Sequence, residues 1–215
     1  MNGNLLRYNK EVKFCLCDVE TFNLNLSFRF NRPWQVSILN FQGNNTSEKD
    51  IRIDWSKVAP NLKIGFEAAR ITHFNQEEHK RIAIQPKEAF SIFWNDLKNC
   101  DYIMGHNILR FDIYLLKGYA EFMGVPWKWI LPKIIDTKAI AQGIKMGVPY
   151  NSKQGSFIDY QYRYSNAVVK GIKTSLSTLA KEFGIDLDES KLHNATYDLE
   201  INKAVWDKLK FQIEL

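Results

Sequence analysis

The chain has 215 residues, 45% of them apolar and 13% aromatic, which suits one domain with a sizeable core and excludes global disorder. Its formal net charge of +5 is compatible with a polyanionic partner but does not identify one. The sequence has no run of about 18 apolar residues and no apolar signal-peptide core, so we expect a cytoplasmic protein that does not enter a membrane.

The first half of the chain predicts two strands, over residues 12–17 and 34–41, separated by a turn-rich polar segment. Residues 44–49 are polar and predict a loop. Residues 62–72 fit either a strand or a short helix, and the sequence does not choose between them.

The second half alternates helices with short apolar runs. Helical spacing and end signals predict helices over residues 86–99, 111–124, 174–184 and 193–210, and short strands over 102–107 and 134–137. Strands that come first, followed by alternating helices and strands, indicate an α/β domain with a mixed sheet.

The chain holds three cysteines, at Cys15, Cys17 and Cys100. The count is odd and no CxxC pair occurs. This pattern predicts reduced thiols that are buried or half-buried, rather than a disulfide framework or a zinc site.

Two acids, Asp18 and Glu20, end the first predicted strand. Side chains at positions i and i+2 of a strand point to the same face, so both carboxylates can reach one point. Carboxylates that lie so close repel each other unless a cation neutralises them, and hard oxygen ligands suit Mg²⁺ or Mn²⁺. The alternative is a strand end that carries two solvated acids.

A second group of polar residues follows the predicted strand at 102–107. His106 and Asn107 lie at its end, and Asp112 lies near the start of the next helix. Asp112 can serve a site, or it can simply cap the helix or favour its dipole. His106 also fits a loop histidine that bonds to the backbone.

The third group opens the last predicted helix. If Asn194 caps this helix, His193 lies in the preceding loop and can fold back toward Asp198, one turn inside the helix. A surface helix with an ordinary cap is the alternative.

Taken together, the order D-x-E, GHN-x4-D and H-x4-D resembles the DEDDh 3′–5′ exonucleases, the family of bacterial proofreading subunits, ribonuclease T and oligoribonuclease. The resemblance implies a ribonuclease-H-like fold with a central mixed five-stranded β-sheet flanked by α-helices. It also implies a single domain over residues 1–215, with a basic and aromatic insertion at about 143–173. Asn194 stands where the tyrosine subfamily needs a tyrosine, so the histidine subfamily fits.

The resemblance further implies a two-metal mechanism with Mg²⁺ or Mn²⁺. Asp18 would bridge both ions, Glu20 and Asp198 would complete the first site, and Asp112 would hold the second through water. His193 would act as general base. The expected reaction releases nucleoside 5′-monophosphates from the 3′ end of a nucleic acid, with single-stranded DNA favoured and RNA left open.

Substrate contacts are expected at four positions beside these motifs. Thr21 and Phe22 would face the terminal nucleotide, although Phe22 is equally a candidate core aromatic. Asn107 and Arg110 flank the second motif and are candidates for orienting the strand.

The insertion suggests further contacts, because basic side chains with interleaved aromatics bind phosphates and stack on bases. The candidates are Lys153, Arg163, Tyr160, Tyr162 and Tyr164. The three alternating tyrosines would share one face of a strand. The alternative is a hairpin that packs its aromatic side on the domain and leaves the basic side chains solvated.

The chain departs from the family where TFNLNLSFRFN replaces the usual Thr-Gly turn after Glu20. It also shows no tail of the kind that tethers proofreading subunits to a polymerase, which favours a freestanding enzyme, with a polymerase partner or a homodimer left open. The rival hypothesis is a nucleic-acid-binding or polymerase-accessory module in which catalysis is secondary. A third is a structural α/β protein with incidental acids.

Overall fold

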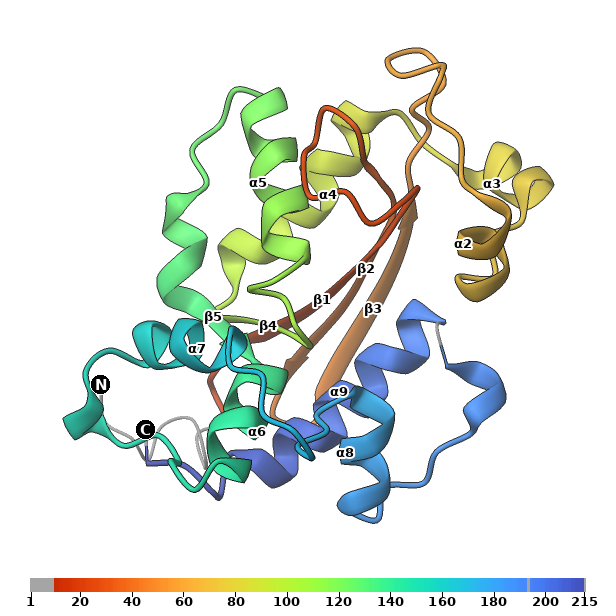
Figure 1. Ribbon diagram of the computed structural model, residues 1–215. Helices are drawn as coiled ribbons and strands as arrows, with labels where there is room; N and C mark the ends of the chain where they lie inside the picture. The colour runs from red at the N-terminus through yellow and green to blue at the C-terminus, as the bar shows by residue number, and fades with distance from the viewer. Residues whose placement is uncertain (1–9, 193, 215) are drawn as a thin grey trace.

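The computed structural model describes residues 10–192 and 194–214. Within them the chain forms one five-stranded sheet in the order β3-β2-β1-β4-β5, with helices packed on both faces (Figure 1). The strands are β1 (Phe14–Thr21), β2 (Pro33–Gln42), β3 (Asn45–Arg52), β4 (Tyr102–Gly105) and β5 (Ile134–Asp136). β1, β2 and β3 pair antiparallel, and β4 and β5 run parallel to β1, so the predicted mixed five-stranded sheet is confirmed.

The helices follow the strands in chain order. They are α2 (Phe66–Ile71), α3 (Gln76–Ile82), α4 (Pro86–Asn99), α5 (Asp112–Phe122), α6 (Thr137–Lys145), α7 (Phe157–Ser165), α8 (Leu176–Glu182) and α9 (Ala195–Leu209), with 3-10 turns η1 (Lys128–Lys133), η2 (Ser152–Gln154) and η3 (Glu189–Lys191). Among the described residues, no helix combines the length and the apolarity needed to cross a membrane.

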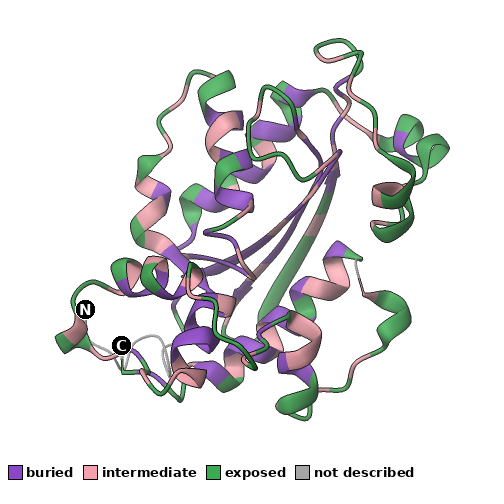
Figure 2. Ribbon diagram, in the orientation of Figure 1, coloured by how far each residue is buried: buried purple, intermediate pink, exposed green. Residues whose placement is uncertain are grey.

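The central strands of the sheet are largely buried, whereas the edge strand β3 is exposed over most of its length (Figure 2). Alternation of side chains along β1 divides the core into two layers. Cys15, Cys17 and Val19 face the layer beneath α4 and α5. Phe14 and Leu16 face the layer beneath α6, α8 and α9. All three cysteines are buried and free, as predicted from their spacing.

The parallel pairing of β1 with β4 determines where the polar end of β1 lies. The pairing runs from Phe14 opposite Tyr102 to Leu16 opposite Met104, and β4 ends at Gly105. The second half of β1 therefore extends beyond the end of β4. Carboxyl ends of neighbouring parallel strands are the usual place for ligand sites in open α/β sheets.

The loop predicted at residues 44–49 is wrong from residue 45 onward, because residues 45–49 belong to strand β3. The sequence Asn45–Arg52 pairs with β2 along its whole length after a turn at Gly43, whose φ is 58°. β3 is an edge strand, exposed over most of its residues, so it needs no apolar alternation. The undecided segment 62–72 contains the short helix α2.

The predicted strand of alternating tyrosines is also wrong. Residues Phe157–Ser165 form helix α7, in which Tyr160 and Tyr164 lie one turn apart on the same face. Both are buried, with ring centroids 4.7 Å apart. The hydroxyl of Tyr160 donates to the carbonyl of Val148 at 2.9 Å. These two rings are core, in keeping with the packing alternative.

Helix α7 covers the β5 edge of the sheet. The side-chain oxygen of Gln161 accepts from the backbone N–H of Asp136 at 2.5 Å, and its amide nitrogen donates to the carbonyl of Ile134 at 2.9 Å. One glutamine thus replaces the hydrogen bonds of a further strand. Helix α7, which lies in the segment expected to bind nucleic acid, therefore covers the edge strand β5.

Candidate active site

The first acids of the candidate site lie at the end of β1. Asp18 and Glu20 are both half-buried, between the buried Val19 and Thr21. Burial raises the pKa of Asp18 to about 7, and the neighbouring Asp198 carboxylate adds to the effect. Burial, followed by the charges of Asp18 and Asp198, raises the pKa of Glu20 to about 8.

Asp112 reaches β1 from the first residue of α5. Its Oδ1 accepts from the backbone N–H of Val19 at 3.1 Å, between the two acids of β1. Burial and the nearby Asp18 carboxylate raise the pKa of Asp112 well above its usual range. Phe111 occupies the N-cap position of α5, and no side chain caps this helix end. Asp112 therefore does not cap this helix, although it lies in the first turn, where a carboxylate favours the helix dipole.

Asp198 comes from the first turn of α9. Asn194 is the N-cap residue, as predicted, and its side-chain oxygen accepts from the N–H of Tyr197 at 3.2 Å. Asp198 and Asp18 line one cavity of about 440 Å³. His193, the expected general base, lies outside the described residues.

Four carboxylates from β1, α5 and α9 thus form one electrostatic cluster. The charge of Asp18 raises the pKa values of Glu20 and Asp112, and the charge of Asp198 raises those of Asp18 and Glu20. Hard carboxylate oxygens are the ligands that Mg²⁺ and Mn²⁺ prefer, so the donor chemistry fits divalent ions. Within residues 10–192 and 194–214, no group of three or more His, Cys, Asp or Glu side chains forms a ready-made metal cluster.

A buried acid that the sequence analysis did not select supports the loop between β4 and α5. Asp136, at the end of β5, accepts from the backbone N–H groups of Asn107, Leu109 and Ala139, each at 3.1 Å. This carboxylate holds the loop that leads to Asp112 and also caps α6. The signal available in the sequence was an acid at the end of the apolar run Ile-Ile-Asp.

His106 is held by side chains of the surrounding helices. Its Nδ1 lies 3.1 Å from Oγ1 of Thr137, which in turn donates to the side-chain oxygen of Asn202 at 2.6 Å. Desolvation of the ring, followed by the charge of Lys138, lowers the pKa of His106 to about 3. A histidine that stays neutral suits the loop role rather than proton transfer at neutral pH.

The expected substrate contacts beside the motifs divide into two groups. Asn107 lines the cavity and has a φ of 69°. Arg110 instead holds the end of α7 through bonds to the carbonyl of Ser165 and the side chain of Asn166. Thr21 is buried and Phe22 belongs to the core cluster under α4 and α5, in keeping with the alternative for Phe22.

The expected contacts of the insertion do not line this cavity. Lys153 and Arg163 are exposed, and Tyr162 is half-buried on the face of α7 opposite Tyr160 and Tyr164. Their roles toward a nucleic acid stay predictions.

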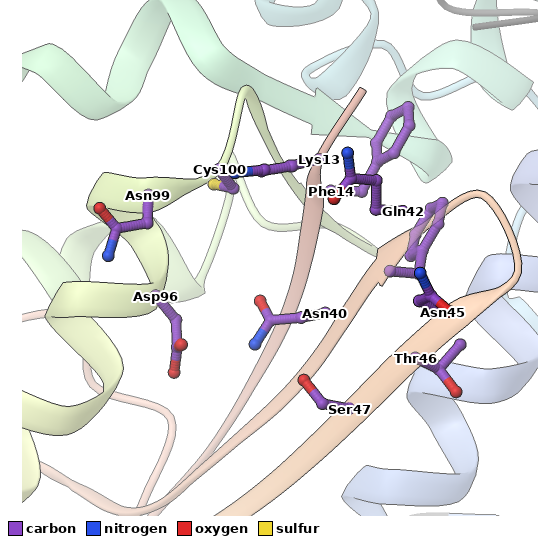
Figure 3. A pocket seen from close by; sticks show the side chains of 11 residues that line it. Lys13, Phe14, Asn40, Gln42, Asn45, Thr46, Ser47, Asp96, Asn99 and Cys100 are labelled. Atoms are coloured by element: carbon purple, nitrogen blue, oxygen red, sulfur yellow. The ribbon is translucent and has the colours of Figure 1, made fainter. Parts of the chain in front are cut away.

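A separate cavity of about 310 Å³ lies at the opposite end of β1, where Lys13 and Phe14 begin the strand (Figure 3). Amide side chains such as Asn40 and Asn99 line it, together with Asp96, which pairs with Lys49. None of the four clustered carboxylates borders this cavity. It is therefore no part of the candidate active site.

Comparison with known proteins gives structural matches only. No protein-family model and no curated protein matches the chain. Escherichia coli exonuclease I does match. A zinc-bound complex with single-stranded DNA gives a TM-score of 0.69 at 16% identity and covers 94% of this chain and 41% of that chain. The complex with a dA16 oligonucleotide gives 0.68 at 19% identity and the same coverage.

These identities establish the fold and nothing finer. A further exonuclease I structure, described as suggesting how processivity is achieved, matches with a TM-score of 0.68 at 18% identity. The ribonuclease-H-like α/β fold expected from the motifs is thereby confirmed. The chain spans about two fifths of the length of the exonuclease I chains that it matches.

Proposed function

We propose that this chain is a metal-dependent 3′–5′ exonuclease that acts on single-stranded DNA and releases nucleoside 5′-monophosphates. The observation that carries the proposal is the convergence of Asp18, Glu20, Asp112 and Asp198 from three separate elements, with the pKa raised at the first three. The fold shared with E. coli exonuclease I, solved with single-stranded oligonucleotides, supports the reaction class.

The four carboxylates of Asp18, Glu20, Asp112 and Asp198 would hold two divalent ions. The chemistry supplied by bound Mg²⁺ or Mn²⁺ is activation of the attacking water and neutralisation of charge on the phosphate oxygens. His193 would accept the proton of that water, a role that suits a histidine pKa near neutrality. The bond from Asp112 to Val19 keeps the acid of α5 in register with the acids of β1.

The rival function is a nucleic-acid-binding or polymerase-accessory module. Binding alone gives no reason to bury carboxylates that raise one another's pKa, because such a cluster opposes both folding and the approach of a polyanion. The cluster therefore favours an enzyme. We propose single-stranded nucleic acid as the substrate.

The test uses single-stranded DNA and the matching RNA, each labelled at the 5′ end, with Mg²⁺ or Mn²⁺ and then with chelator. We expect products that shorten from the 3′ end, and no products with chelator or with Asp18→Asn. Asp186→Asn, which removes an exposed acid outside the cavity, is the matched control and should retain full activity. Absence of cleavage with both polymers, combined with intact binding, would contradict the proposal and favour the accessory module.

A further inference from the structure

Lys138 places a cation in the cavity that two acids of the cluster line. It is the second residue of α6, is half-buried, and lines the cavity of about 440 Å³ together with Asp18 and Asp198. In the part of the chain that the structure describes, Lys138 takes part in none of the ion pairs between basic and acidic side chains. Its ammonium thus shares a cavity with carboxylates without being neutralised by them.

The position of Lys138 is unfavourable for helix stability. The N-terminus of a helix carries partial positive charge, so a lysine in the first turn of α6 is repelled by the helix dipole. Capping is already provided by Asp136, whose side chain accepts from the N–H of Ala139. Stability of α6 therefore does not explain the lysine.

The ammonium of Lys138 is held in place by a neutral partner. Nζ donates to Oδ1 of Asn107 at 3.2 Å. Asn107 is itself fixed, because its backbone N–H donates to Oδ1 of Asp136 at 3.1 Å and its φ is 69°. A lysine ammonium has three N–H donors, so this bond leaves donors and the full positive charge for an anion.

We infer that Lys138 binds a non-bridging phosphate oxygen within the last two linkages of the substrate strand, with Asn107 orienting its ammonium. This inference rests on the proposed exonuclease function. Phosphodiester groups are the anions of the proposed substrate, and Asp18 and Asp198 of the acid cluster line the same cavity as Lys138. The contact recognises the backbone and not the base, so it applies to any sequence.

The first experiment compares Lys138→Met with Lys128→Met, which removes an exposed lysine of η1 before the start of β5. Binding of a labelled single-stranded DNA is measured in chelator, without turnover, across a range of salt concentrations. A charged hydrogen bond predicts about 10-fold weaker binding for Lys138→Met and a salt slope smaller by about one phosphate contact. Lys128→Met should bind like the unmodified chain. The unfolding temperature of Lys138→Met should not fall, because the helix dipole opposed this lysine.

The second experiment replaces single phosphates with neutral methylphosphonates, one linkage at a time from the 3′ end. The unmodified chain should lose affinity at the linkage that Lys138 contacts, and Lys138→Met should lose little further at that linkage. Equal methylphosphonate penalties in both proteins, or unchanged binding by Lys138→Met, would overturn the inference. Because these assays require no cleavage, an inactive chain that binds through Lys138 would overturn the proposed function alone.

Discussion

At the scale of single residues, the candidate site is an arrangement that opposes folding when no cation is present. Asp18 and Glu20 have raised pKa values because their carboxylates are buried beside other acids. Such groups hold protons in the folded chain at pH values where the unfolded chain has released them. These acids lower the stability of the folded chain, so stability does not explain their presence. Binding of a ligand explains the cluster better.

The first prediction concerns pH and the stability of the metal-free protein. The pKa of Asp18 rises from 3.8 to about 7, and that of Glu20 from 4.5 to about 8. Between these limits the folded state binds more protons than the unfolded state, so the free energy of unfolding falls as pH rises from about 4 to about 8. Asp18→Asn removes one of these charges and should raise the unfolding temperature at pH 8 in chelator, with little effect at pH 4.

Thermal unfolding followed by circular dichroism at both pH values checks this prediction, and Asp186→Asn serves as the exposed control. A variant Asp18→Asn that is no more stable than the unmodified chain at pH 8 would show that the acids do not repel each other in the folded state.

The second prediction concerns Asp136, which touches no acid of the cluster through a hydrogen bond but holds the loop before Asp112. Asp136→Asn leaves one carbonyl oxygen to serve the three backbone N–H groups and adds two donors of its own. Hydrogen bonds to charged groups and buried unsatisfied donors predict a loss of about 2–4 kcal/mol in the free energy of unfolding. Urea unfolding measures it, and a loss below about 1 kcal/mol would contradict the role of Asp136.

At the scale of elements, the sequence correctly predicts the helices and strands whose local sequence pattern agrees with how they pack in the folded chain. The strands β1 and β2 are apolar runs, α4 and α5 have helical apolar spacing, and Asn194 caps α9 as expected. β3 could not be predicted from hydrophobicity, because an edge strand pairs through its backbone while its side chains stay in solvent. Over so short a segment, the spacing of the tyrosines of α7 fits both the period of 2 of a strand and the period of 3.6 of a helix. The segment forms a helix because one helical face packs against α6.

The third prediction concerns the contact between α6 and α7. A Cβ atom at Gly143 would lie 2.0 Å from Oη and 2.7 Å from Cζ of Tyr160. Gly143→Ala should therefore lower the free energy of unfolding by about 1–3 kcal/mol, although alanine is the better helix former. Urea unfolding of Gly143→Ala alone and combined with Tyr160→Leu tests this contact. Recovery in the double variant identifies the clash, whereas equal losses in both would place the cause elsewhere.

At the scale of the whole molecule, the sheet topology explains why motifs far apart in sequence meet. β1 extends past the end of β4, the chain leaving β4 leads into α5 and Asp112, and β5 ends at Asp136 beside the same loop. The motif order predicted which acids belong together, and the structure brings four of them into one cluster. The sequence could not reveal the support given by Asp136 or the cation at Lys138, because both depend on how β5 and α6 pack beside β4.

The last prediction follows from the charge balance of this assembled site. A divalent cation that binds the folded chain alone stabilises it by mass action, by about 2.7 kcal/mol when its concentration is 100 times the dissociation constant. For a chain of this size, that corresponds to a rise in unfolding temperature of about 5–10 °C. Mg²⁺ or Mn²⁺ titrated at pH 8 should produce this rise in the unmodified chain and little of it in Asp18→Asn, because the variant lacks one carboxylate of the proposed metal site. The rise should shrink at pH 5, where protons occupy Asp18 and Glu20 and compete with the metal. An equal rise in both proteins would mean that the ions act elsewhere on the surface, and the acid cluster would then need another ligand.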